Sequence, residues 1–508
     1  MFSLKGKRVL IFQQRGWAIN IGHYLAKMLQ KEGVVLAAFT TKQTTDDFIR
    51  NQREVVYEKI VSTDDATDNP KAVLAGDKIT LKEICENLEI DSVWPFVYSE
   101  RNHTRSYQDK YYYAYKQNVS DEGIIDYVGA VYKYVFKMFD EFKPDIIITP
   151  NFVALQHLIS YFIAKKRGIP MVALMDSKIN ANYIFMYDYN YASGSFHNRV
   201  DELNAGKAKS SNAEKAKKYI EEFRKKFKVP EGAEYNSFGN KKRTLWQKIR
   251  NMLSPYYHIY KWYTTKQINH WRSVGPTIDY RPPKIILRDH YAFRRYIKFS
   301  NNFKYYPFEK IGKCAYFPLQ VQPEATIDVI APFFNNQIEA ARLVAMSLPD
   351  DYTLVVKEHP AMIGKRPPSY FEKLNRTPNI KLIDYRIPSQ KVMEKASLIV
   401  SPSGTTVAEA AFLNKPVIQL GNLGTTEKLP NVWKHTDMPA LPKKIKEVLS
   451  ANLKTDDYER KLLNYVSAAY DCGIEANYLN MWERGKEVDK MDKLWNFYKT
   501  EIEKLLNN

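Results

Sequence analysis

The sequence is organised around two segments of its C-terminal half, DYTLVVKEHP at 351–360 and ASLIVSPSGTTVAEAAFLNKPVIQLG at 396–421. The apolar runs 354–356 and 398–400 are typical of buried parallel strands, and polar residues follow each run directly. The second polar cluster opens an expected helix at 407–413, and a further strand follows it. Ligands of such strand–helix–strand units bind at the carboxyl ends of the strands, so the two polar clusters predict a ligand site.

The residue types in these clusters suit a phosphate. Gly404 allows the backbone to approach a ligand closely, and the helix that follows offers unpaired N–H groups at its start. Glu409, one turn further on, is placed to accept hydrogen bonds from ribose hydroxyls. A Ser-Gly-Thr-Thr turn is also an ordinary helix cap, so the prediction depends on both clusters together. The predicted nucleotide-sugar ligands are Lys357, His359, Ser403, Gly404, Thr405, Thr406 and Glu409, with the first two at the end of a neighbouring strand.

These segments, with YFPLQVQPEATID at 316–328, resemble the C-terminal half of GT-B glycosyltransferases. More narrowly, they resemble the bacterial capsule polysaccharide biosynthesis proteins, which include Kdo transferases. That family carries a similar PL-x-x-QPE segment, which here contains Gln322 and Glu324, where its nucleotide-binding domain begins. GT-B sialyltransferases likewise pair an HP motif with a Ser/Thr motif around the phosphate of a CMP-sugar. The resemblance is specific over 316–440, looser over 1–190 and absent from 200–300.

The resemblance implies an α/β protein with two Rossmann-like domains that face a cleft. We expect an acceptor domain at 1–195, a helical basic insertion or linker at 196–310 and a nucleotide-sugar domain at 311–480. The end of the chain, 481–508, is expected to form a helix that in this fold commonly crosses back to the first domain. The implied activity is transfer of a sugar, with CMP-Kdo as the expected type of donor, to a glycan or lipid-linked acceptor of surface polysaccharide. Helix dipole and cations neutralise the phosphate in this scheme, so no metal and no cofactor is expected.

Composition adds an expectation about partners and compartment. The chain has 508 residues, 44% of them hydrophobic, and a formal net charge of +19, which favours an anionic partner. No nucleic-acid motif is evident, so nucleic acid is not an expected partner. Three scattered cysteines and the lack of a signal-like or membrane-spanning apolar run predict a cytoplasmic protein.

Further cleft residues are expected in the first domain. A strand at 8–13 leads into a loop with Arg15, Gly16 and His23, which the resemblance places at the cleft, although His23 equally suits packing at a helix start. Asn151 follows a strand at 144–149, and Lys178 follows a strand at 171–174. Side chains beyond the ends of parallel strands are the expected ligands of an acceptor.

The catalytic base has two candidates. A strand expected at 92–98 ends before Glu100 and Arg101, so Glu100 is placed to act as a general base, although a surface ion pair of Glu100 with Arg101 or Arg105 is the preferred explanation. Asp121 and Glu122 match the letters of the acidic motif that supplies the base in GT-B sialyltransferases. They also begin an expected amphipathic helix, where acids are ordinary partners of the helix dipole. In the implied mechanism His359 stabilises the departing phosphate.

The segment between the domains differs in composition. The charged stretch 205–228 predicts a solvated helix with little apolar face. The stretch 241–277 holds eight Lys or Arg and no Asp or Glu, interleaved with Trp and Tyr. Three interpretations stay open for it: docking on an anionic membrane surface, helical packing onto the core, and binding of an acidic glycan.

Two other functions are compatible with the sequence. UDP-N-acetylglucosamine 2-epimerases share the fold implied by the resemblance and carry a similar Ser-Gly turn before a helix. A non-catalytic component of polysaccharide export or assembly would use the basic stretch to bind an anionic polymer.

Overall fold

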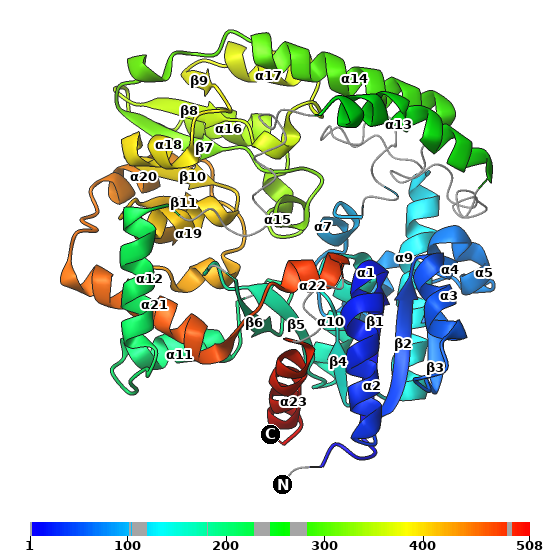
Figure 1. Cartoon of the computed structure of the whole chain (residues 1–508). Helices are drawn as coiled ribbons and strands as arrows, with labels where there is room; N and C mark the ends of the chain where they lie inside the picture. The colour runs from blue at the N-terminus through cyan, green and yellow to red at the C-terminus, as the bar shows by residue number, and fades with distance from the viewer. Residues whose placement is uncertain are drawn as a thin grey trace.

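The computed structural model describes residues 3–100, 103, 119–179, 181–190, 192–227, 244–264, 282–484 and 490–507. Two sheets, each covered by helices, form two α/β domains that face each other (Figure 1). None of the helices within these ranges is long and apolar enough to cross a membrane.

The first sheet has seven strands in the order β13-β6-β5-β4-β1-β2-β3. The five strands from β5 to β3 are parallel, whereas β6 runs antiparallel to β5, and β13 antiparallel to β6. Their central residues are buried apolar side chains, except in the edge strand β3, where Ile60 and Val61 are half-buried. The strands are β1 (Arg8–Gln14), β2 (Val35–Thr41), β3 (Lys59–Ser62), β4 (Ile146–Ile148), β5 (Met171–Asp176), β6 (Asn182–Met186) and β13 (Gly473–Glu475).

The second sheet has six parallel strands in the order β12-β11-β10-β7-β8-β9. Strand order reverses between β7 and β10, and ligands of doubly wound sheets bind beyond the strand ends at such a switch point. The predicted class of two Rossmann-like domains is thus confirmed. The strands are β7 (Cys314–Pro318), β8 (Thr353–Lys357), β9 (Ile380–Ile383), β10 (Leu398–Ser401), β11 (Val417–Gln419) and β12 (Val432–Lys434).

Helices cover the sheets and join the domains. Those of the first domain are α1 (Arg15–Trp17), α2 (His23–Lys31), α3 (Gln43–Asn51), α4 (Asp64–Asp68), α5 (Pro70–Leu74), α6 (Leu81–Leu88), α7 (Trp94–Val97), α9 (Asp121–Phe142) and α10 (Leu155–Lys166). Those of the second are α15 (Ala325–Asp328), α16 (Gln337–Ala345), α17 (Pro368–Arg376), α18 (Ser389–Lys395), α19 (Thr405–Phe412) and α20 (Leu441–Leu449). Between the domains in sequence lie α11 (Ser195–Asn204), α12 (Ala213–Lys225), α13 (Leu245–Thr264) and α14 (Pro283–Asn302).

The strand expected at 92–98 is wrong. This segment forms the short helix α7, with Pro95 in its first turn. Proline lacks the N–H that a central strand donates, and its fixed φ suits the start of a helix. Glu100 therefore does not follow a strand of the sheet.

The expectation of a solvated helix at 205–228 is also wrong. Helix α12 buries Ala216, Tyr219, Ile220 and Phe223, which share one face at helical spacing. The Phe223 ring lies 4.4 Å from the ring of Phe412 in α19, centroid to centroid. This helix therefore belongs to the core that supports the second domain.

The end of the chain returns to the first domain. After α21 (Asp456–Cys472), β13 joins the first sheet and α22 (Tyr478–Arg484) contacts α1. The last helix, α23 (Met491–Asn507), buries Leu494 and Tyr498, and Lys499 Nζ lies 2.7 Å from Glu32 Oε1 at the end of α2. Both ends of the described chain thus lie on the same domain (Figure 1).

Candidate functional site

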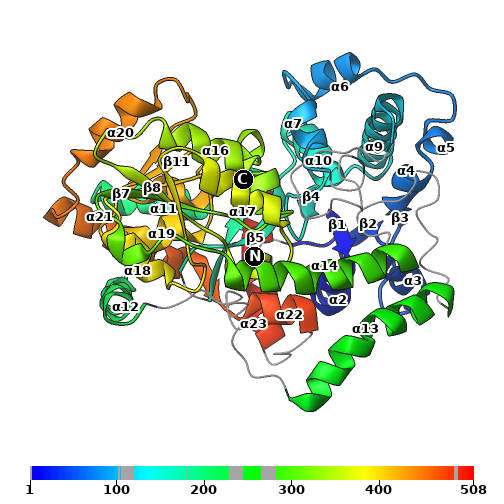
Figure 2. The same ribbon diagram turned by 90° about the horizontal axis from the view of Figure 1, so that it is seen from above.

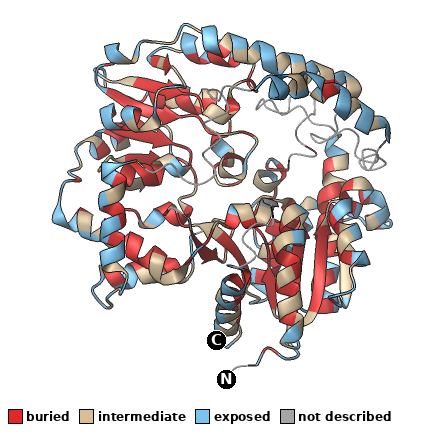
Figure 3. Ribbon diagram, in the orientation of Figure 1, coloured by how far each residue is buried: buried red, intermediate tan, exposed pale blue. Residues whose placement is uncertain are grey.

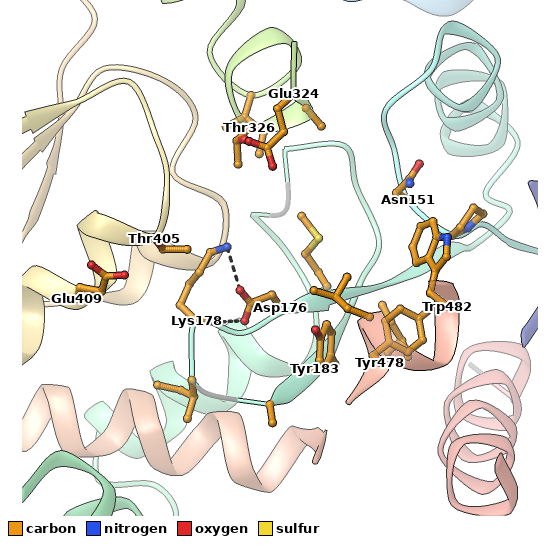
Figure 4. Close-up of a pocket in the computed structure, with 18 of the residues that line it drawn as sticks. Asn151, Asp176, Lys178, Tyr183, Glu324, Thr326, Thr405, Glu409, Tyr478 and Trp482 are labelled. Carbon is orange, nitrogen blue, oxygen red and sulfur yellow. Dashed lines mark hydrogen bonds and ion pairs between the residues drawn. The ribbon is translucent and has the colours of Figure 1, made fainter. Parts of the chain in front are cut away.

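A cavity of about 330 Å³ lies between the two domains (Figure 4). The first domain lines it with Asn151, Asp176, Lys178 and Tyr183, and the second with Glu324, Thr326, Thr405 and Glu409. The C-terminal return adds Tyr478 and Trp482. The cavity therefore combines an aromatic wall with charged and polar groups from both domains.

The second-domain wall is built at the switch point. Gly404 has a φ of +110°, and a Cβ at this position would lie 2.5 Å from Oε1 of Gln320, in the loop after β7. Gln320 Nε2 in turn lies 3.3 Å from Ser401 Oγ at the end of β10. The contact of the added Cβ is with the end of a flexible side chain, so it is the φ of +110° that favours glycine at this position.

Helix α19 starts directly after this glycine and has no side-chain cap. The N–H groups of a first helical turn have no partner within the helix, and the dipole makes this end positive. Thr405, the first residue of the helix, lines the cavity. The predicted anion-binding end of the helix thus faces the space between the domains.

Two of the predicted hydroxyl ligands have other positions. The Ser403 hydroxyl donates to the carbonyl of Thr326, so it ties the loop before α19 to α15 instead of pointing at a ligand. Thr406 is half-buried and is not among the residues that line the cavity. Of the threonine pair, the structure brings Thr405 to the site.

Glu409 is an acid of the cavity with a raised pKa. Burial raises its pKa to about 7, while a hydrogen bond from Thr405 and the charges of Lys357 and Lys178 act in the opposite direction. Lys178 belongs to the first domain and Lys357 to the second, so the Glu409 carboxyl group interacts electrostatically with cations of both domains. Acids with raised pKa values in a cleft are typical of functional sites.

The sequence predicts that Lys357 and His359 follow a strand next to β10. They follow β8, which is not adjacent to β10. Strand β7 lies between β8 and β10, because sheet order differs from chain order. Lys357 is buried, which lowers its pKa to about 8, with Glu358 and Glu409 opposing the shift. Neither residue lines the cavity, although the charge of Lys357 reaches Glu409.

His359 is a neutral group at physiological pH. Burial, followed by the charges of Lys357 and Arg366, lowers its pKa to about 4. Its Nδ1 accepts from the N–H of Ala361 at 3.2 Å, which leaves the ring proton on Nε2. The residue is half-buried, so the imidazole offers a hydrogen-bond donor and no positive charge.

The PL-x-x-QPE segment divides into a supporting part and a site residue. Gln322 is buried, and its Nε2 donates to the carbonyl of Asn335 at 3.0 Å. Glu324 instead lines the cavity at the start of α15 (Figure 4). Gln322 therefore positions the loop that presents Glu324.

In the first domain, Asn151 and Lys178 lie in the cavity as expected. Lys178 Nζ lies 3.4 Å from Asp176 Oδ2, and the Lys178 N–H donates to Asp176 Oδ1 at 2.8 Å. This pair lies between the second-domain wall and the aromatic wall (Figure 4).

The loop after β1 lies against the C-terminal return. A Cβ at Gly16 would be 3.0 Å from the carbonyl oxygen of Trp482, and Arg15 beside it is exposed. His23 is buried, and its Nε2 lies 2.8 Å from Glu54 Oε2. The packing interpretation of His23 fits this geometry, and none of the three residues lines the cavity.

The predicted bases lie outside the cavity. Glu100 is buried, and the Tyr127 hydroxyl donates to its Oε2 at 3.3 Å. Asp121 and Glu122 are exposed in the first turn of α9, whose N-cap Ser120 accepts from the N–H of Gly123 at 3.2 Å. Arg101 lies outside the described residues. The acids that line the cavity are Asp176, Glu324 and Glu409.

Sequence reasoning missed the buried Arg366 and the aromatic wall. Arg366 Nη2 donates to the carbonyl of Gln320 at 2.6 Å, and Nη1 lies 3.4 Å from Glu358 Oε2. It thereby fixes the loop against which Gly404 packs. The acidic Glu358 of the KEHP segment could have indicated a nearby basic partner such as Arg366. Nothing in the sequence around Tyr478 or Trp482 indicates that they lie beside residues more than 300 positions earlier.

No family model and no curated protein matches the sequence. Solved structures that align with this chain include a UDP-GlcNAc 2-epimerase from Methanocaldococcus jannaschii, at 12% identity over 90% of this chain and 97% of that chain, with a TM-score of 0.24. They also include KpsC, a beta Kdo 2,7 transferase, from Thermosulfurimonas dismutans, at 13% identity over 72% and 89%, with a TM-score of 0.35. The calicheamicin glycosyltransferase CalG4 aligns at 13% identity over 97% and 98%, with a TM-score of 0.27. The fold assignment rests on the strand order of this chain itself.

Proposed function

We propose that this protein is a glycosyltransferase that moves a sugar from a nucleotide-sugar to a hydroxyl acceptor. The observation that carries the proposal is the cavity at the switch point. One wall presents the uncapped start of α19 at Thr405, and the facing wall presents Asp176 and Lys178 of the other domain. An anion site and a carboxylate on opposite sides of one space suit a donor phosphate and an acceptor hydroxyl.

In this proposal the donor phosphate lies against the first turn of α19, and the Glu409 carboxyl group accepts a hydrogen bond from a ribose hydroxyl. Lys178 lines the cavity and the charge of Lys357 reaches Glu409, so two cations lie close enough to pair with the charge of an acidic donor sugar. Together with the resemblance in sequence, this supports a CMP-activated acidic sugar such as CMP-Kdo. The acceptor is then a glycan or glycolipid of surface polysaccharide, and the free cysteines accord with a cytoplasmic location.

The proposed reaction uses Asp176 as the base. Its ion pair with Lys178 fixes the position of the carboxylate. The carboxylate takes the proton of the acceptor hydroxyl, whose oxygen attacks the anomeric carbon. The bond from that carbon to the phosphate oxygen breaks, and the electron pair leaves with the phosphate. The N–H groups of α19 stabilise the charge that develops there, so the scheme needs no metal.

A panel of CMP, UDP, GDP and their sugars tests the donor class by thermal shift. A bound ligand at a hundredfold excess over its Kd stabilises the folded state by about 2.7 kcal/mol. We expect stabilisation by the cytidine nucleotides and not by the others. Conversion of UDP-GlcNAc without an acceptor would instead show an epimerase, and polymer binding without any nucleotide effect would show an export component.

The variant Asp176→Asn tests the base. We expect kcat for transfer to fall on the order of a hundredfold or more while the thermal shift by the nucleotide remains. Asp437→Asn, at an exposed position, is the matched control and should leave both unchanged. Retained transfer by Asp176→Asn would remove this residue from the mechanism.

A further inference from the structure

Helices α13 and α14 form a hairpin that projects beside the two domains (Figures 1 and 2). Of the twenty residues of α13, Pro255 alone is buried. Figure 3 shows the helix mostly exposed, with the remaining residues largely of intermediate burial. The interpretation that this basic and aromatic segment packs onto the core is therefore wrong for 245–264, and the rest of 241–277 lies outside the described residues.

Helix α14 is the part that anchors the hairpin. Its Phe293 packs so closely on the second domain that a Cβ at Gly364 would lie 2.6 Å from the Phe293 ring. Near its end, Asn301 Oδ1 accepts from the Tyr385 hydroxyl at 2.7 Å. Helix α13 is thus held away from the core by a helix that is fixed to it.

The exposed surface of α13 carries large apolar side chains in adjacent rows. Trp246, Leu253 and Tyr257 are 75%, 52% and 55% exposed, and their spacing places them on one face. The neighbouring row holds Leu245, Met252, Tyr256, Tyr260 and Tyr263, which are 51% to 75% exposed. A contiguous apolar patch of this kind on a soluble surface marks an interaction site.

Positive charge surrounds the same patch. Lys248, Arg250 and Lys261 lie on α13, which has no acidic residue, and α14 adds five Lys or Arg against the single Asp289. Lys261 Nζ lies 5.2 Å from the centre of the Tyr257 ring, so cation and aromatic groups share one face. The hairpin therefore complements a surface that is both anionic and partly apolar.

We propose that the hairpin of α13 and α14, the docking hairpin, binds the surface of an anionic lipid bilayer. Trp, Tyr, Leu and Met side chains insert at the headgroup boundary, while Lys and Arg contact the lipid phosphates. An acidic glycan would satisfy the cations but would offer no apolar volume for Leu245, Met252 and Leu253. Bilayer docking uses both features, and it does not depend on the sugar-transfer proposal.

Flotation of the full-length protein with vesicles tests this proposal. The vesicles contain phosphatidylcholine alone, or phosphatidylcholine mixed equally with phosphatidylglycerol. We expect binding to the mixed vesicles only. The charge variant K248Q/R250Q and the apolar variant W246S/L253S should each weaken that binding on the order of tenfold or more.

Matched controls come from exposed positions of the first domain. K71Q/K82Q removes two cations that are each 84% exposed, and Val56→Ser removes an apolar side chain that is 76% exposed. Both should bind as the parent does. All variants change surface residues, so unchanged thermal melting confirms that the fold is intact.

Three outcomes would overturn the proposal. The first is no binding to either vesicle, and the second is equal weakening by the control variants. The third is binding to a soluble acidic polysaccharide, lost in K248Q/R250Q, with no flotation on vesicles, which would identify a glycan surface. Quenching of protein fluorescence by brominated lipid, lost in Trp246→Phe, would place the indole at the bilayer.

Discussion

At the scale of single residues, Gly404 supplies the backbone conformation that leads into α19. An alanine here would adopt a φ reserved for glycine and press its Cβ against Gln320. We expect Gly404→Ala to lower the free energy of unfolding by about 1–3 kcal/mol and to abolish the thermal shift by nucleotide. Gly312→Ala is the matched control, since nothing lies within 4 Å of its added Cβ. Equal effects of the two substitutions in urea denaturation would contradict backbone strain at position 404.

Glu409 predicts a dependence of stability on pH. Its pKa is raised from 4.5 to about 7, so the folded state holds this proton more tightly than the unfolded state does. The contribution to stability is therefore largest at low pH and is lost as pH rises through that window. Relative to Glu409→Gln, the parent should lose on the order of 3 kcal/mol of unfolding free energy between about pH 4.5 and about pH 7.

Urea denaturation of both proteins across that range measures the difference. Glu86→Gln, at a side chain 66% exposed, controls for the general effect of removing an acid. Parallel pH profiles for the parent and Glu409→Gln would show that burial does not raise the pKa of this group.

At the scale of elements, buried apolar strands were predictable and their neighbours were not. The runs around β8 and β10 read clearly because both faces of a parallel strand are buried. Strand β7 lies between β8 and β10, and this order depends on the topology of the whole domain. The same limit applies to the site. Thr405 and Lys178 follow their own strands, whereas the hydrogen bond of the Ser403 hydroxyl to the Thr326 carbonyl depends on a helix 77 residues earlier.

Helix α12 shows a signal that sequence reasoning overlooked. Ala216, Tyr219, Ile220 and Phe223 follow helical spacing, but their charged neighbours hid the pattern. We expect Phe223→Ala to cost about 3–4 kcal/mol of unfolding free energy, because the ring is buried against Phe412. Lys217→Ala, on the exposed face, should be nearly neutral in the same urea titration. A loss of unfolding free energy no larger than that of Lys217→Ala would instead indicate that α12 is a solvated helix.

At the scale of the whole molecule, α21 joins the domains through a tyrosine. The Tyr465 hydroxyl lies 2.9 Å from the carbonyl of Ser177 in the first domain and 3.1 Å from that of Thr425 in the second. Tyr465→Phe leaves both carbonyls without this buried donor, which should cost about 1–2 kcal/mol of unfolding free energy. Tyr263→Phe, at an exposed position, is the control. If the two variants lose the same unfolding free energy within error, the Tyr465 hydroxyl does not stabilise the contact between the domains.

The late strand β13 has a consequence for biosynthesis. The edge strand β6 is translated within the first two-fifths of the chain, yet its partner emerges only with residues 473–475. A nascent first domain must therefore wait on the ribosome with a bare sheet edge, the kind of surface that recruits chaperones or foreign strands. Moving the segment from residue 473 onward to the front of the gene, as a circular permutant, would let that domain close while the rest is still being made.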